Sequence, residues 1–454
     1  MQRLAVINVV GLTEALVGKH TPNISNLVKD SIVTLNPPLP AVTCSVQSTM
    51  LTGVAPDEHG IVANGWHERE TGDTAFWRQS NDLVRGEKVW EALHAIDSTL
   101  TVANMFWWFN MHSSVDIAVT PRPVYLADGG KLPDIWTNPS SLRSSLQKQF
   151  GQFPLFKFWG PMAGIESTQW IVNATIEVEK TYSPTLTLIY IPHLDYSMQR
   201  VGPDHSSISE ELRAVDGQVG RLIDHCEERD INVCILSEYG IESVSDAVAI
   251  NRVLRDGGFL TIRMELGREY LDASLSRAFA VPDHQIAHVY VRSETDIENV
   301  AQLLRSTHGI DAVLAGDDRS DLDHDRCGEL VAISDGDKWF SHDWWRSDAV
   351  APDYQTTVDI HRKPGYDPRE LLFAEGWRGN RARVALKLLW KKLGGRAIFD
   401  VITLDPKRVR GSHGRTTQMG APPPILIAPV CAKEMPQSLP AAALKNLMIE
   451  WITS

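Results

Sequence analysis

Short apolar runs alternate with longer stretches of helical periodicity along this chain, and this alternation restricts the possible folds most strongly. The apolar runs are LAVINVV (4–10), LTVANM (100–105), LTLIYI (186–191) and INVCILS (231–237). Helical patterns lie between them, for example at 87–96 and 207–226. Continuous apolar strands joined by helical crossovers are typical of parallel sheets covered on both faces. We therefore predict an α/β fold, with a mainly parallel sheet sandwiched by helices.

The pattern changes between about 258 and 345. Here the order is strand, strand, helix, strand, in FLTIRMEL, AHVYVRSE, DIENVAQLLRS and ELVAIS. The rest of the chain carries no repeat and no low-complexity linker that would mark a second independent domain. We expect one domain over 1–454, with an inserted α+β cap subdomain at 258–400.

Composition limits the partners. The chain has 44 Lys and Arg against 57 Asp and Glu, a net charge of −13, which argues against binding a nucleic-acid polymer or an anionic membrane. No apolar run approaches the ~20 residues of a membrane span, and the first run is too short for a signal peptide. The five cysteines are scattered without CxxC spacing, so we expect a reducing, cytoplasmic setting.

Polar side chains follow the predicted strands, where ligands collect in open α/β sheets. Asp195 and Glu238 each come directly after an apolar run, and His413 lies between two glycines in GSHG. These residue types are common metal ligands. Each also has a structural interpretation: a carboxylate there can cap a helix, and a His is often only hydrogen-bonded. Asp283, His284 and His361 are further candidates.

The segment LPAVTCSVQSTMLTG (39–53) offers several hydroxyls and one thiol. Thr43 follows an extended Pro-rich stretch and precedes a helical pattern, and a helix N-terminus favours developing negative charge. Thr43 is thus a candidate nucleophile, although Thr43 or Ser45 could simply be the N-cap. Cys44 is a second candidate nucleophile, which would need a His and an Asn or Asp brought near by folding. No P-loop, GxGxxG, HExxH or GxSxG motif is present.

In order along the chain, PAVTCSVQSTMLTGVAPDEHGIVANG, the strand ends near 195 and 238, and GSHG resemble the alkaline phosphatase superfamily. Within it, the chain is most similar to the nucleotide pyrophosphatase/phosphodiesterase branch. The resemblance implies that Thr43 is the nucleophile, because it lies nine residues before the Thr of LTG. It also implies a divalent metal centre with one or two zinc ions. In the family, two such ions ~4 Å apart polarise the phosphoryl group.

The resemblance assigns Asp195, Glu238 and His413 as metal ligands, but four ligand positions of the family differ here, one of them Glu238, which stands where the family has an Asp. Gln199 stands where the family has a His, and Val10 where it has an Asp. Tyr239 replaces the His of the family's Ser-Asp-His-Gly. Asp283 and His284 are weaker candidates that could replace lost ligands, and Asn8, on the same strand face as Val10, could add an amide oxygen.

Two functions follow from this resemblance. The first is a metal-dependent hydrolase of phosphate esters or diesters that works through a covalent phospho-threonine. The second is a metal-depleted relative that binds or traffics a phosphorylated small molecule without hydrolysing it. Gln47, Trp107 and Trp108 are the candidate substrate-binding residues, since ligand pockets are mostly apolar with a few placed polar groups. A thiol hydrolase using Cys44 is a third alternative.

Overall fold

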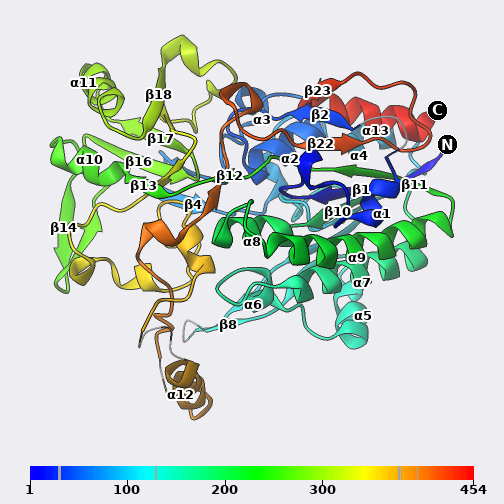
Figure 1. Ribbon diagram of the computed structural model, residues 1–454, viewed down its shortest axis with the longest axis horizontal. Coiled ribbons are helices and arrows are strands. Elements are labelled where there is room, and N and C mark those ends of the chain that lie inside the picture. Colours follow the sequence, from blue (N-terminus) through cyan, green and yellow to red (C-terminus); the bar gives the residue numbers. More distant parts are fainter. Residues whose placement is uncertain (29–31, 128–129, 377–378, 380, 396) are drawn as a thin grey trace.

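A nine-stranded sheet forms the centre of the computed structural model, which describes residues 1–28, 32–127, 130–376, 379, 381–395 and 397–454 (Figure 1). The spatial order is β23 (Ser438–Pro440), β2 (Val33–Asn36), β22 (Ile425–Ile427), β11 (Ile231–Leu236), β1 (Arg3–Val9), β10 (Leu186–Ile191), β5 (Val102–Met105), β6 (Ile117–Pro121) and β9 (Ile135–Asn138). The run from β11 to β6 is parallel, whereas β22 and β9 pair antiparallel with their neighbours. The predicted α/β fold is confirmed.

Helices cover both faces of this sheet. One layer contains α7 (Ile165–Tyr182), α8 (His193–Val201) and α9 (Ile208–Glu227), and the other contains α2 (Thr43–Thr52), α4 (Val89–Ile96) and α13 (Leu444–Thr453) (Figure 1). In α9 the residues Leu212, Val215, Val219 and Leu222 are buried at helical spacing, so one stripe faces the sheet. Strand β1 is buried on both faces, as its continuous apolar sequence requires. In the described part of the chain, no helix is long and apolar enough to span a membrane.

A second sheet with its own core lies beside the first, at the left of Figure 1. It is antiparallel, in the order β16 (Ala278–Asp283), β17 (Ile286–Val291), β19 (Leu330–Ser334) and β18 (Ile310–Ala315), and it packs against α10 (Ile250–Asp256) and α11 (Glu294–Arg305). A short parallel pair, β13 (Asp246–Ala249) and β20 (Lys338–Ser341), precedes and follows these elements. The cap boundaries 258 and 400 remain a prediction, and β13 and α10 begin before the first of them.

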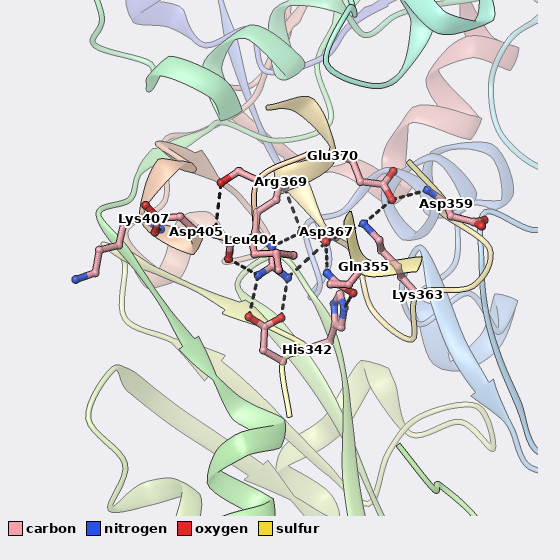
Figure 2. A network of polar contacts seen from close by, with 12 residues as sticks. His342, Gln355, Asp359, Lys363, Asp367, Arg369, Glu370, Leu404, Asp405 and Lys407 are labelled. Carbon is pink, nitrogen blue, oxygen red and sulfur yellow. Dashed lines mark hydrogen bonds and ion pairs between the residues drawn. The ribbon is translucent and has the colours of Figure 1, made fainter. Parts of the chain in front are cut away.

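A buried ion network connects the second sheet to the helical layer of the first (Figure 2). The Arg369 guanidinium donates two hydrogen bonds to Asp343, of 2.8 and 2.7 Å, and its Nε donates to Asp367 at 2.7 Å. Lys363 Nζ lies 3.0 Å from Asp367 and 2.8 Å from Glu370. Asp343 follows β20, whereas Glu370 accepts a hydrogen bond from the Trp159 indole at 2.7 Å, so the network joins the two cores.

The network is electrostatically self-consistent although its ions are almost completely buried. Burial alone would raise the pKa of the Asp367 carboxyl, but the charges of Arg369 and Lys363 lower it well below its ordinary value. Burial would likewise lower the pKa of Arg369, but Asp343 and Asp367 raise it. Each ion is therefore stable only in the presence of its partners.

Replacing one cation of the network should destabilise the protein strongly. Arg369→Met leaves Asp343 and Asp367 buried without their main partner, and we expect the free energy of unfolding to fall by about 3 to 5 kcal/mol. Lys433→Met is the matched control, because the Lys433–Glu450 pair is solvent-exposed and should matter by less than about 1 kcal/mol. Urea unfolding measures both, and equal effects of the two substitutions would contradict the prediction.

The lowered pKa of Asp367 also predicts a pH dependence. Below about pH 4 the unfolded chain takes up a proton at Asp367 while the folded protein keeps it ionised, so the free energy of unfolding falls as the pH drops. Above that pH the contribution of Asp367 is fully present. Between pH 5 and pH 2.5 we expect the free energy of unfolding to fall further in wild type than in Asp367→Asn. The difference between the two proteins is set by how far the pKa of Asp367 in the folded state lies below its pKa in the unfolded chain. Parallel losses in urea unfolding would refute this.

Candidate active site

The carboxyl ends of the central strands bring polar side chains into one buried cluster. β1 contributes Asn8, the residue after β11 is Ser237 and the next is Glu238, and α8 directly after β10 carries Asp195. His413 arrives from the far end of the sequence, after β21 (Gly411–Ser412), which pairs with β12 (Glu242–Ser243). This convergence follows from the parallel strand directions, since parallel strands end at the same edge of a sheet.

Thr43 is the first residue of α2, and Val42 is the N-cap. The alternative that Thr43 or Ser45 caps this helix is therefore wrong. The Thr43 Oγ1 lies 3.0 Å from the Tyr239 hydroxyl. Burial, with the nearby Asp195 and Glu238, raises the pKa of Tyr239 well above its ordinary value. The phenol stays protonated and orients the Thr43 hydroxyl at the positive end of the helix.

Glu238 is held by two side-chain amides. Asn8 Nδ2 and Gln47 Nε2 each donate to Glu238 Oε1 at 2.5 Å. Gln47 cannot present its oxygen instead, because the Trp108 backbone N–H donates to Gln47 Oε1 at 2.7 Å. Burial raises the pKa of Glu238 to about 8, although hydrogen bonds from Gln47, Asn8 and Thr43 oppose the rise. Glu238 therefore gains and loses its proton near neutral pH, and its ionised form can act as a base toward the nearby Thr43 hydroxyl.

Asp195 and His413 form a second pair. Asp195 Oδ1 and His413 Nε2 are 4.0 Å apart, and both atoms are buried without a hydrogen-bond partner. His413 Nδ1 donates to the Ala41 carbonyl at 2.8 Å, which leaves the Nε2 lone pair facing Asp195. Burial raises the pKa of Asp195 to about 7 and lowers that of His413 to about 3. A neutral imidazole and an orphaned carboxyl oxygen are a donor set that fits a divalent metal.

Gln199 orients this pair from the same helix as Asp195. Its Nε2 donates to Asp195 Oδ2 at 2.9 Å, and its Oε1 accepts from the Tyr366 hydroxyl at 2.9 Å. Residues 193–201, which follow β10 directly, form helix α8. Positions 195 and 199 are four residues apart and share one helix face. Helix formation therefore explains why the two side chains meet.

Asp283 and His284 reach the cluster from the second sheet. Both oxygens of Asp283 accept hydrogen bonds from Asn64, at 2.7 Å from its backbone and 3.1 Å from its side chain. The His284 ring lies 3.6 Å from the His413 ring and 3.8 Å from the Tyr366 ring. His361 is elsewhere, with its Nδ1 3.4 Å from the Phe76 carbonyl. The structure therefore brings Asp283 and His284 to the site but not His361.

The predicted substrate wall is only partly at the site. Trp107 is completely buried in the core of the main sheet, so its side chain offers no surface to a ligand. Trp108 belongs to an aromatic cluster, in which its ring is 4.9 Å from Trp77 and Trp77 is 5.9 Å from Tyr366. Trp159 extends the cluster, 5.6 Å from Tyr366. Gln47 is buried, and both ends of its amide are occupied by protein groups.

Three partners of the site were missed in the sequence. The resemblance gives Tyr239 only a metal-ligand position, whereas its hydroxyl hydrogen-bonds the Thr43 hydroxyl. Asn64 connects Asp283 to the start of α2, because its Oδ1 accepts from the Cys44 backbone N–H at 2.9 Å. Tyr366 contacts Gln199 and His284. Asn64 lies within PAVTCSVQSTMLTGVAPDEHGIVANG, so the resemblance points to its neighbourhood. No sequence pattern points to Tyr366. Among the residues that the structure describes, no three His, Cys, Asp or Glu side chains converge on one metal position.

Comparison with known proteins identifies relatives of one kind. The profile of the type I phosphodiesterase / nucleotide pyrophosphatase family matches residues 4–367. An uncharacterised pyrophosphatase/phosphodiesterase of Schizosaccharomyces pombe is 24% identical over 244 residues, which is 50% of this chain and 42% of that protein. Human ectonucleotide pyrophosphatase/phosphodiesterase family member 1 is 25% identical over 252 residues, 53% of this chain and 23% of that protein. The aligned parts thus span less than half of these relatives.

Solved structures agree on the fold. Murine ectonucleotide pyrophosphatase/phosphodiesterase 5, in an inactive form with AMP, superposes with a TM-score of 0.60 at 14% identity, covering 100% of this chain and 95% of that one. Phosphonoacetate hydrolase from Sinorhizobium meliloti with phosphonoformate gives a TM-score of 0.62 at 12% identity, covering 99% and 96%. At these identities the likeness shows a shared fold.

The site geometry predicts that Cys44 is unreactive. Its side chain is completely buried, and burial, with Asp283 and Glu238 nearby, raises its pKa well above the ordinary value. Iodoacetamide at pH 8 should label Cys431, which is partly exposed, at least ~10-fold faster than Cys44 in the folded protein. Peptide mass spectrometry measures both rates in one sample. Similar rates would restore the thiol alternative.

Proposed function

Because the chain belongs to the type I phosphodiesterase / nucleotide pyrophosphatase family, we propose that it hydrolyses a phosphate ester or diester of a small molecule, with Thr43 as the nucleophile. AMP and phosphonoformate in the two similar structures support a compact phosphorylated or phosphonylated substrate. The fold places ligands of this class at the carboxyl edge of a parallel sheet, where Thr43 lies.

The observation that carries the proposal is the position of the Thr43 hydroxyl. It lies at the first residue of α2, where helix N-termini favour phosphate groups. Tyr239 fixes it at 3.0 Å, and the Tyr239 ring stacks on His413 with centroids 3.6 Å apart. The nucleophile is therefore one side chain away from the Asp195–His413 pair. Glu238 lies near the same hydroxyl, which lowers the pKa of the Glu238 carboxyl against the effect of burial.

These contacts define two displacement steps. Thr43 Oγ attacks phosphorus, its proton passes to Glu238, and the bond from phosphorus to the leaving oxygen breaks. The leaving oxygen takes that electron pair and departs. Water then attacks phosphorus, the bond to Thr43 Oγ breaks, and Glu238 returns the proton to Thr43 while the water proton leaves to solvent. A covalent intermediate of this kind divides one difficult substitution into two easier ones.

Asp195 and His413 are the residues that would hold a divalent metal, for which the family resemblance implies zinc. When bound, such an ion supplies Lewis-acid stabilisation of phosphoryl oxygens. Gln199 would be the third ligand if its carboxamide turned over, presenting its oxygen to the pair. The Tyr366 hydroxyl can accept a hydrogen bond as readily as it donates one, so this rotation keeps the contact at 2.9 Å.

A second function is favoured by one specific observation, which is that Val10 and Tyr239 occupy metal-ligand positions of the family and are both buried. A threonine without an activating metal or base is a poor nucleophile. A relative of this kind would bind a phosphorylated small molecule without hydrolysing it. Both functions predict that the protein binds a phosphorylated small molecule, but only the first predicts that it hydrolyses this molecule.

Thr43 substitution distinguishes these functions. We expect wild type to hydrolyse bis-p-nitrophenyl phosphate or p-nitrophenyl phosphate, and Thr43→Ala to lower kcat by at least ~10³-fold, because the attacking oxygen is gone. The release of nitrophenolate measures both rates. The phosphorylated intermediate should be detectable on Thr43 by mass spectrometry after acid quenching.

Cys44→Ser is the matched control, since Cys44 neighbours Thr43 in α2 but takes no part in the reaction; its activity should remain near that of wild type. Turnover that survives Thr43→Ala would refute the nucleophile. A wild type that binds AMP in calorimetry without hydrolysing either substrate would establish the binding function instead.

A further inference from the structure

We infer that this chain binds one metal ion rather than two, because hydrogen-bonded amides occupy the half of the site where the family resemblance implies the second ion. The inference deepens the proposed function and rests on it for the location of the site. Its evidence is the contrast between two halves of one buried cluster: the Asp195–His413 pair and the trio Asn8, Glu238 and Gln47, called here the amide cluster.

The amide cluster lacks the ligands that a second ion needs. The resemblance assigns this half to residues 10, 238 and 239, and Val10 is apolar and completely buried. Tyr239 offers a phenol in place of an imidazole, and its hydroxyl is hydrogen-bonded to Thr43 at 3.0 Å. One carboxyl group remains and no imidazole, whereas the Asp195–His413 pair offers both of these zinc-ligand types.

The remaining carboxyl is already bound by hydrogen-bond donors. Asn8 Nδ2 and Gln47 Nε2 both lie 2.5 Å from Glu238 Oε1. The orientation of Gln47 is fixed, because its oxygen accepts the Trp108 backbone N–H at 2.7 Å. The amide N–H groups present their positive ends to Glu238, where a cation would otherwise lie, and they would repel a cation at the same oxygen.

Two acceptor atoms of the amide cluster, Glu238 Oε2 and Asn8 Oδ1, have no hydrogen-bond partner. They supply at most one negative charge, that of Glu238, and no nitrogen ligand. Oxygen donors of this kind suit a hard ion such as Mg²⁺ better than zinc, but Mg²⁺ demands near-ideal octahedral geometry. The N–H groups of Asn8 and Gln47 already point at Glu238 Oε1, so an ion bound to this carboxyl would face two amide donors.

The Asp195–His413 pair shows the opposite arrangement. Asp195 Oδ1 and His413 Nε2 have no partner and lie 4.0 Å apart. The other atom of each side chain is engaged, since Gln199 donates to Asp195 Oδ2 at 2.9 Å and His413 Nδ1 donates to Ala41 at 2.8 Å. Such outer hydrogen bonds orient metal ligands and leave their free atoms directed at the ion.

Zinc stoichiometry tests the inference without an activity readout. The full chain is stripped with a chelator, reloaded with ZnCl₂ and desalted, and zinc per chain is measured by mass spectrometry of the metal and by calorimetry. We expect one ion in wild type. His413→Ala should lose it, with affinity reduced at least ~10-fold. Glu238→Gln should keep it.

Glu238→Gln suits this test because it preserves the fold of the amide cluster. Its new carboxamide oxygen can still accept the N–H groups of Asn8 and Gln47 that point at Glu238 Oε1, and its nitrogen takes the place of Oε2, which has no hydrogen-bond partner. Circular dichroism checks the folding of each variant. A Val10→Asp and Tyr239→His double variant, which restores the missing ligand types, should raise the stoichiometry to two.

Two ions in wild type, or the loss of an ion in Glu238→Gln, would overturn the inference. Wild-type protein without zinc, or full binding in His413→Ala, would also overturn it. These outcomes are separate from failure of the proposed function, which appears as turnover that survives Thr43→Ala in protein of any zinc content.

Discussion

The candidate site depends on burying carboxyl groups without a cation beside them. Asp195 and Glu238 are almost completely buried, and burial raises their pKa values to about 7 and about 8. Amides, hydroxyls and the neutral imidazole of His413 accompany them. The ion network in Figure 2 buries Asp343 and Asp367 just as deeply, but Arg369 and Lys363 neutralise them. The carboxyls of the ion network hold the two cores together. Asp195 and Glu238, which have no cation partner, remain able to bind a proton or a metal.

These two sets of carboxyls are neighbours in space. Tyr366 hydrogen-bonds Gln199 and stacks on His284, and the next residue is Asp367 of the ion network. The network thus fixes the segment that contacts the Asp195 side of the site. His284 comes from the turn between β16 and β17 in the second sheet, so the site lies where the two sheets meet. Its geometry requires both cores to be folded and docked.

Within the site, the substitutions relative to the family act together. Losing an Asp at position 10 and a His at position 239 would leave Glu238 as an isolated buried charge, which is costly. Asn8 and Gln47 supply hydrogen bonds in their place, and Tyr239 turns its hydroxyl to Thr43. A carboxyl whose pKa lies near neutrality is suited to proton transfer, so in the proposed reaction Glu238 would serve as the proton acceptor near Thr43.

The sequence by itself determined the sheet and the neighbourhood of the site. The continuous apolar runs of β1, β10 and β11 fix a buried parallel sheet, and parallel strands end at one edge, so Asp195 and Glu238 had to meet there. Only the tertiary structure decided which atoms are free. The helix over 193–201 brings Asp195 and Gln199 together. The amide donors on Glu238 and the Tyr239 hydroxyl contact depend on pairs of residues far apart in the sequence, up to 230 positions for Asn8 and Glu238. Hydrogen-bond orientation of this kind depends on side-chain packing, which has no periodic signal in a sequence. For the same reason Trp107 lies in the core and His361 lies away from the site, although both carry suitable chemistry.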